Sequence, residues 1–251
     1  MLDSNQIQTI LAFPLRDEDA RKKLLIGSLV ALASLIIPVL PLLVLQGYVV
    51  RMMRQVIEEN QQPSMPEWTD WNELLMDGLR FFAIRLVIML PVLLALGFGF
   101  VLMFAPFSLI IIDPENADNG VFALFFMLGN LIWVALLMLV LAIVIPLMIV
   151  LAAAEGHVTV HRSVSAAFRV SEWWPIFRKN MGGFVMAYLI AMGISMLGNI
   201  AIQFIMYTFV LICILPFILM PYSVYLQMVM YAFFARAYVD GRDALVGEPS
   251  A

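Results

Sequence analysis

The sequence predicts an all-α membrane protein, a polytopic helical bundle with four spans plus a proline-broken re-entrant hairpin, or with five spans if that segment crosses. Of its 251 residues, 63% are hydrophobic and 13% are charged. A soluble domain is about half apolar and a quarter charged. Long stretches carry no charge, and the 14 Lys and Arg residues all lie between or beyond them. We therefore treat 1–251 as a single integral membrane domain.

Four charge-free runs define the expected helices: 24–50, 86–112, 121–154 and 184–235. A helix needs about 20 residues to cross a bilayer, so the second and third runs are one span each. The fourth is long enough for two spans, which we expect to be antiparallel. Its most polar stretch, 199–203, is the predicted turn between them.

The positions of the basic residues predict the orientation. Short cytoplasmic loops carry the excess of Lys and Arg. Segments 51–85, 155–183 and 236–251 are therefore expected in the cytoplasm, as is the N-terminal segment 1–23. The acidic loop 113–120 contains no Lys or Arg and is expected outside. This is the arrangement of a multi-pass protein of the cell (inner) membrane.

The first run leaves two possibilities open. It has basic residues near both ends, and Pro38 and Pro41 lie at its middle, where proline breaks a helix. Two arms of about 12 residues reach only about 18 Å each, which favours a re-entrant hairpin with both ends in the cytoplasm. Its tip, at Pro38 and Pro41, would have to pack among other helices. The alternative is a single span.

The two linkers expected in the cytoplasm, 51–85 and 155–183, each contain a pair of tryptophans. Asp70 and Glu73 have the spacing of a capping box, which predicts a helix that begins at Trp71. Tryptophan rings favour the headgroup level, and adjacent Lys or Arg can reach lipid phosphates. The predicted membrane-interface or partner residues are Trp68, Trp71, Arg80, Trp173, Trp174, Arg178 and Lys179.

The first of these linkers carries a recognisable pattern. Residues 47–54 read GYVVRMMR, and residues 68–79 read WTDWNELLMDGL. This resembles the uncharacterised polytopic membrane protein family known as domain of unknown function 4013. The likeness continues through the linker from Ala167 to Asn180 and the ending at 235–238. The resemblance implies a multi-pass prokaryotic membrane protein, and it implies no activity.

His157 and His161 are the candidate ligand residues. Four positions apart on a helix, they share a face and could hold a metal or a tetrapyrrole with Glu155 nearby. The simpler interpretation, which we favour, is a juxtamembrane helix whose histidines meet lipid headgroups. Cys213 is the sole cysteine, so a multi-thiolate site is excluded. No metal or cofactor is predicted.

The function suggested by these patterns is structural. No catalytic constellation is evident, so no enzyme is expected. The charge-free runs also lack the charged groups that ion-coupled transporters carry inside the bilayer, which argues against a proton-coupled mechanism. We expect a non-enzymatic accessory, scaffold or assembly subunit whose partners are membrane lipids and other membrane-protein subunits. A transporter, channel or lipid-handling protein is the alternative. The net charge of −4 argues against a nucleic-acid partner.

Overall fold

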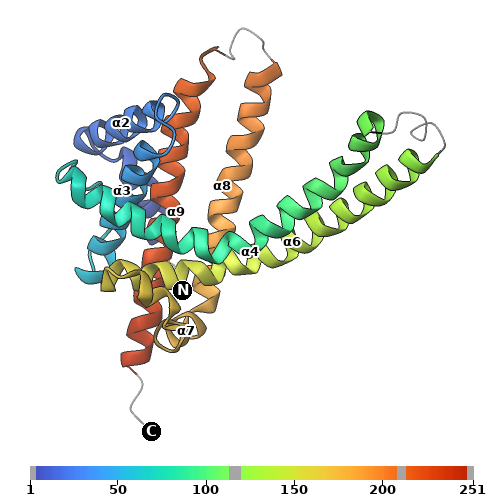
Figure 1. Cartoon of the computed structure of the whole chain (residues 1–251). Coiled ribbons are helices and arrows are strands. Elements are labelled where there is room, and N and C mark those ends of the chain that lie inside the picture. Colours follow the sequence, from blue (N-terminus) through green and yellow to red (C-terminus); the bar gives the residue numbers. More distant parts are fainter. Residues whose placement is uncertain (1–3, 113–119, 208–212, 248–251) are drawn as a thin grey trace. The chain divides into compact units, whose positions relative to one another are not determined.

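The computed structural model describes residues 4–112, 120–207 and 213–247, and every regular element within those ranges is helical. Four helices in this part are long and apolar enough to cross a membrane. The predicted all-α polytopic fold is therefore confirmed (Figure 1). In chain order the elements are α1 (Ser4–Ala12), η1 (Phe13–Leu15), α2 (Glu18–Ala33), α3 (Leu40–Glu58), α4 (Trp71–Ile112), α6 (Val121–His161), η2 (Val164–Phe168), α7 (Val170–Lys179), α8 (Met181–Tyr207) and α9 (Leu215–Val246).

The chain divides into two compact units. Unit 1 comprises Met1–Ile84 and Ile149–Ala251, and unit 2 comprises Arg85–Met148. Helix α9 is the centre of unit 1, where it packs against α2, α3, α7 and α8. Helix α9 supplies fully buried side chains such as Met228 and Phe233, and helix α3, which it contacts, supplies Tyr48 and Met52. The core of unit 1 therefore lies around α9.

The first apolar run folds as two helices, α2 and α3, which contact each other and are separated by residues 34–39. This pair of helices agrees with the predicted proline-broken hairpin and not with one continuous helix over 24–50. Pro41 lies in the first turn of α3. There a missing N–H costs nothing, because the first helical N–H groups have no partner within the helix.

The tip of this hairpin differs from expectation. It is not covered by other helices, since every residue from 35 to 40 is exposed and Ile36 is 85% exposed. The turn satisfies its own backbone: the N–H groups of residues 34–37 donate to the carbonyls of Ala31, Leu32 and Ala33. Because those groups are already paired, no covering helix is required. Pro41 is buried, whereas Pro38 is exposed at the tip.

The fourth run forms α8 and α9, which lie side by side in opposite directions, as predicted (Figure 1). The predicted turn at 199–203 is wrong, because those residues lie inside α8, which continues to Tyr207. The Asn199 side chain donates to the carbonyl of Ser195 one turn earlier, so its polarity is satisfied without leaving the helix. Tyr222 of α9 closes the pair by donating to the carbonyl of Ile194.

Unit 2 is built from the parts of α4 and α6 between Arg85 and Met148. Small residues let the two helices approach closely. A Cβ at Gly129 would lie 2.7 Å from the carbonyl oxygen of Leu102, and one at Gly99 would lie 2.8 Å from the Trp133 ring. The predicted acidic loop lies outside the described residues except for Gly120, which has a φ of 72°.

Candidate functional site

The pattern at 47–79 forms a crossing of α3 and α4 at two glycines. A Cβ at Gly47 would overlap the carbonyl oxygen of Leu74, and one at Gly78 would overlap that of Leu43. The two glycines also face each other, because a Cβ at Gly78 would lie 2.9 Å from the backbone nitrogen of Gly47. Only glycine permits helices this close, so both glycines of the pattern have a packing role.

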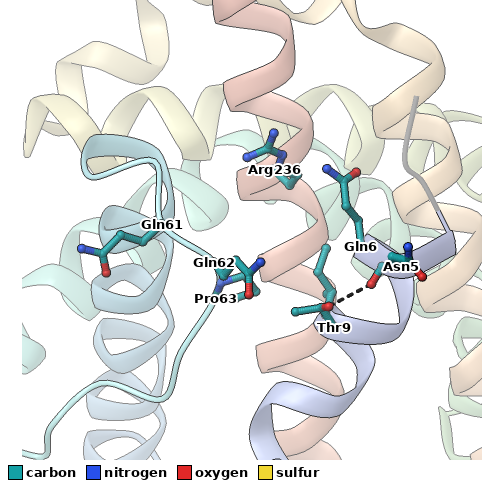
Figure 2. Close-up of a pocket in the computed structure, with 8 residues that line it drawn as sticks. Asn5, Gln6, Thr9, Gln61, Gln62, Pro63 and Arg236 are labelled. Atoms are coloured by element: carbon teal, nitrogen blue, oxygen red, sulfur yellow. Dashed lines mark hydrogen bonds between the residues drawn. The ribbon is translucent and has the colours of Figure 1, made fainter.

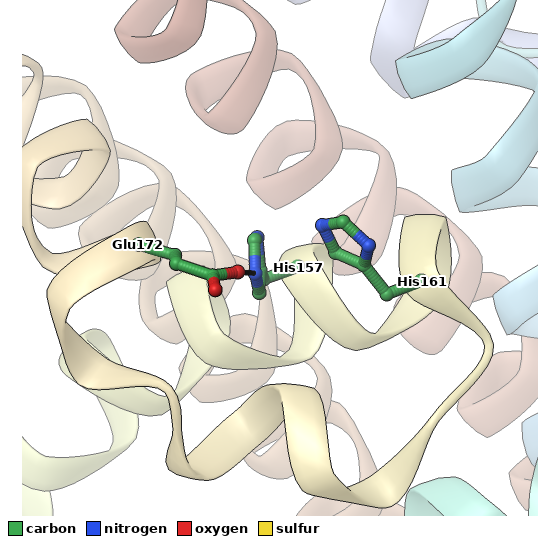
Figure 3. A group of neighbouring side chains, drawn as sticks. All are labelled: His157, His161 and Glu172. Atoms are coloured by element: carbon green, nitrogen blue, oxygen red, sulfur yellow. Dashed lines mark hydrogen bonds and ion pairs between the residues drawn. The ribbon is translucent and has the colours of Figure 1, made fainter.

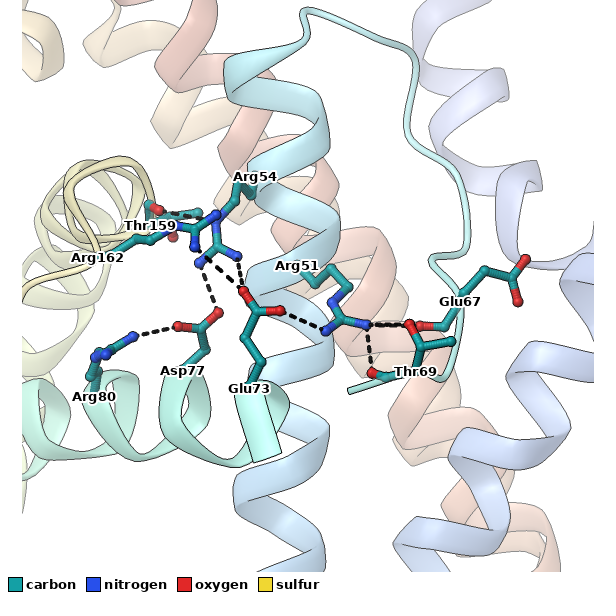
Figure 4. Close-up of polar contacts among 9 residues, drawn as sticks. All are labelled: Arg51, Arg54, Glu67, Thr69, Glu73, Asp77, Arg80, Thr159 and Arg162. Carbon is teal, nitrogen blue, oxygen red and sulfur yellow. Dashed lines mark hydrogen bonds and ion pairs between the residues drawn. The ribbon is translucent and has the colours of Figure 1, made fainter. Parts of the chain in front are cut away.

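Charged side chains of the same pattern bridge the two helices (Figure 4). Arg54 of α3 is buried, and its Nη2 lies 2.7 Å from Oδ2 of Asp77, which is 4% exposed. The other carboxylate oxygen of Asp77 accepts from Arg80 at 2.8 Å. Glu73 pairs with Arg51 at 3.2 Å and with Arg54 at 3.5 Å. Arg80, predicted as an interface residue, is thus engaged within the protein.

The end of α6 joins this network. The carbonyl oxygen of Thr159 accepts from Nε of Arg54 at 3.5 Å, and Arg162 lies 3.4 Å from Glu73 (Figure 4). Three helices of unit 1 are therefore tied together by one set of arginines. Removing one partner of a buried ion pair costs about 3–5 kcal/mol, because the remaining charge is left uncompensated.

The linker between α3 and α4 is fastened to the same surface. Trp68 stacks on Tyr48 with ring centroids 3.8 Å apart and planes 4° apart, and its indole N–H donates to the carbonyl of Lys23. The Tyr48 hydroxyl donates to the carbonyl of Pro66, and Arg51 donates to that of Thr69 at 2.7 Å. Trp68 is thus a packing residue rather than a free anchor.

Helix α4 begins at Trp71, as the sequence predicts, but by another means. The carboxylate of Glu73, which a capping box would turn back to residue 70, is engaged by arginines instead. Asp70 has a φ of 53°, a left-handed conformation that Asp tolerates better than most residues. The Trp71 side chain is exposed, so an interface role for it stays a prediction.

His157 and His161 lie on α6, where their rings approach with centroids 4.2 Å apart (Figure 3). His157 is only 5% exposed, which contradicts the expected contact with headgroups. Its Nδ1 lies 2.9 Å from the Tyr238 hydroxyl, and its Nε2 lies 2.9 Å from Oε2 of Glu172. The carboxylate beside the histidines is thus Glu172 of α7, and hydrogen bonds from His157 and Arg169 hold its pKa below the ordinary value.

The predicted interface residues of the second linker divide into two groups. Trp173 is 6% exposed and donates its indole N–H to the carbonyl of Ala167, so it is a packing residue. Trp174, Arg178 and Lys179 are exposed on α7, where with Pro175 and Leu245 they line a shallow groove of about 420 Å³. Their role at the membrane interface stays a prediction.

A cavity of about 200 Å³ brings together segments that are distant in sequence (Figure 2). Asn5, Gln6 and Thr9 of α1 line it with Gln61 of the α3–α4 linker and Arg236 of α9. Each of these segments belongs to a stretch predicted on the cytoplasmic side. Residues 5 and 61 flank the first apolar run, and their proximity is what a returning hairpin requires.

Two functional candidates were missed by reasoning from sequence. Glu172 lies 15 residues beyond His157 on a different helix, and no fixed spacing announces that pairing. Tyr238 lies 81 residues beyond His157. The only sign of it in the sequence was its place in the segment 235–238, which is part of the family resemblance. Glu155, the expected neighbour, is buried, and the metal-compatible group in the described residues is His157, His161 and Glu172.

Comparison with known proteins agrees with the predicted family. A family model described as "Protein of unknown function (DUF4013)" matches residues 30–215, which include the glycine crossing, its arginine network and the histidine pair. No curated protein matches the chain, and no solved structure does. The matched segment is well over half of the sequence. The chain therefore belongs to the DUF4013 family of membrane proteins.

Proposed function

We propose that this protein is a non-enzymatic scaffold or assembly subunit of the cell (inner) membrane, which binds the helices of another membrane protein through unit 2. The linkers 51–85 and 155–183 and the C-terminus lie in the cytoplasm in this proposal. The observation that carries it is a groove of about 440 Å³ between α4 and α6 within unit 2. The lining residues are Leu102, Ala105, Pro106, Ser108, Phe125, Leu128, Gly129 and Ile132.

The chemistry of this groove suits an apolar side chain. Ser108 is the sole hydroxyl among its lining residues, and that hydroxyl donates to the carbonyl of Ala105 within the same helix. Lipid tails are as apolar as leucine, so helices in a membrane gain no hydrophobic driving force by associating. They associate instead through close packing at small residues. Gly129 and Ala105 are small residues in the lining of this groove. A bulky side chain from a neighbouring helix fits such a recess.

The charged residues of unit 1 support the same proposal. The carboxylates of Glu73 and Asp77 are engaged by arginines, and Arg51 also holds the backbone of the linker. Groups committed to joining helices are poorly placed to bind a substrate or move a proton. We infer that the arginine network fixes the packing of α3 with the parts of α4 and α6 that belong to unit 1.

Photocrosslinking in cells tests this proposal. A photoreactive amino acid replaces Leu128, which lines the groove and is 42% exposed. The matched control replaces Leu94, an exposed residue of α4 that does not line the groove. We expect a discrete protein adduct from position 128 and lipid adducts alone from position 94. Equal adduct patterns at the two positions contradict a specific partner.

A lipid-handling protein is the second candidate, favoured by the apolar lining of the same groove. An acyl chain and an apolar side chain share the chemistry that the groove recognises. A lipid adduct at position 128 that is saturable and exceeds the adduct at position 94, without any protein adduct, favours this candidate over the scaffold.

A further inference from the structure

Three side chains from two helices of unit 1 converge on one point. His157 and His161 come from α6 and Glu172 from α7, and one ligand atom of each lies within 4.8 Å of the other two (Figure 3). None of the three belongs to the glycine crossing or the arginine network. The cluster is therefore a separate feature of the molecule.

Tyr238 of α9 fixes the orientation of the buried imidazole. An ionised carboxylate can only accept, so Nε2 of His157 carries the proton that it donates to Glu172, and Nδ1 accepts from the Tyr238 hydroxyl. A hydroxyl can equally accept a hydrogen bond from Nδ1–H. Tyr238 thus also supports the tautomer whose Nε2 lone pair is free for a cation. Metal-bound histidines are regularly held in this way through their second nitrogen.

The distances suit a small transition-metal ion. Zinc binds imidazole nitrogen and carboxylate oxygen at about 2.0–2.2 Å, which places tetrahedral ligand atoms roughly 3.3–3.5 Å apart. Nε2 of His157 and Oε2 of Glu172 are already 2.9 Å apart. His161 is exposed, so its side chain can turn inward without disturbing the core. Arg169 pairs with Oε1 of Glu172 and leaves Oε2 for the ion.

We propose that His157, His161 and Glu172 form a binding site for a divalent transition-metal ion such as Zn²⁺, with Tyr238 as its positioning residue. Two imidazoles and one carboxylate would leave a fourth coordination position open. The ion would bridge α6 and α7. Occupancy would therefore also stabilise unit 1.

The test measures Zn²⁺ binding to the full chain in detergent micelles, without a histidine tag and after treatment with a chelator. A chromophoric chelator competes for Zn²⁺, which gives both the stoichiometry and the Kd. We expect about one Zn²⁺ per chain. His161→Ala and Glu172→Gln should each weaken binding at least about tenfold, and both side chains are exposed, so folding is not at risk.

Two further variants separate the site from general binding. Glu18→Gln changes an exposed carboxylate paired with Lys22 on α2 and should leave the Kd unchanged. Tyr238→Phe keeps the buried ring and should weaken binding about 10–100-fold, the usual effect of losing an outer partner. The proposal is overturned if the unaltered chain binds no Zn²⁺, or if His161→Ala and Glu172→Gln bind it as tightly as Glu18→Gln does.

Discussion

The crossing of α3 and α4 makes a quantitative prediction for Gly47→Ala. The new Cβ would overlap the carbonyl oxygen of Leu74 and lie 2.5 Å from its carbonyl carbon, whereas carbon atoms prefer contacts of about 3.5–4.0 Å. The helices must therefore part by at least roughly 1.0–1.5 Å, which costs about 1–3 kcal/mol as overpacking. The same movement stretches the 2.7 Å hydrogen bond between Arg54 and Asp77 and removes about 1.5–3 kcal/mol.

Alanine recovers about 1 kcal/mol of helix propensity, so the expected net loss lies between about 1.5 and 5 kcal/mol. For a chain of this length that lowers the midpoint of thermal unfolding by roughly 3–20 °C. Tryptophan fluorescence of the purified protein in detergent measures the midpoint. Gly193→Ala is the matched control, because its Cβ meets nothing within 4 Å and it should gain stability. Equal midpoints for the two variants would refute the close crossing.

Three more outcomes are expected. Asp77→Asn should lower the free energy of unfolding by at most about 3–5 kcal/mol, since the buried Arg54 loses the nearer of its two carboxylate partners and keeps Glu73, and an unchanged midpoint contradicts that role. In a Cys213→Ala background, a cysteine at Asn119 should react with an impermeant thiol reagent on intact cells, and one at Gln61 only after lysis; the reverse order overturns the orientation. Replacing Pro38 and Pro41 with leucine should favour one continuous helix and move a tag at the N-terminus outside, whereas an unmoved tag shows that other contacts hold the hairpin.

The long helices could be predicted because the signal is local. An uncharged run of sufficient length has few alternatives to a membrane helix, and the four candidate spans follow those runs. The predicted turn at 199–203 was wrong because polar residues alone do not end a helix. Asn199 finds a partner on its own helix, at the carbonyl of Ser195. The prediction that other helices cover the hairpin tip was wrong for a related reason. The N–H groups of residues 34–37 donate to carbonyls at the end of α2, so the tip needs no covering helix.

The candidate site was less predictable because its partners are distant in sequence. The four-residue spacing of His157 and His161 is a property of one helix and could be recognised at once. The approach of Glu172 depends on the turn after α6, and that of Tyr238 depends on how α9 packs. Glu73 shows the same limit: its spacing from Asp70 suggested a cap, yet arginines of α3 bind its carboxylate.

The most distinctive stretch of the sequence, at 47–79, invites a search for catalytic residues there. Its glycines are accounted for by a helix crossing, its charged groups by ion pairs within that crossing, and Trp68 by a stack on Tyr48. A pattern whose side chains are committed to packing needs no further chemistry to explain it. We therefore expect the binding functions of this protein to reside elsewhere, with partner binding at the apolar groove of unit 2 and metal binding at the histidine–glutamate cluster. Variants of the pattern should lower stability and binding together. Variants of Leu128 or His161, whose side chains are exposed, should change binding while the unfolding midpoint without ligand stays the same.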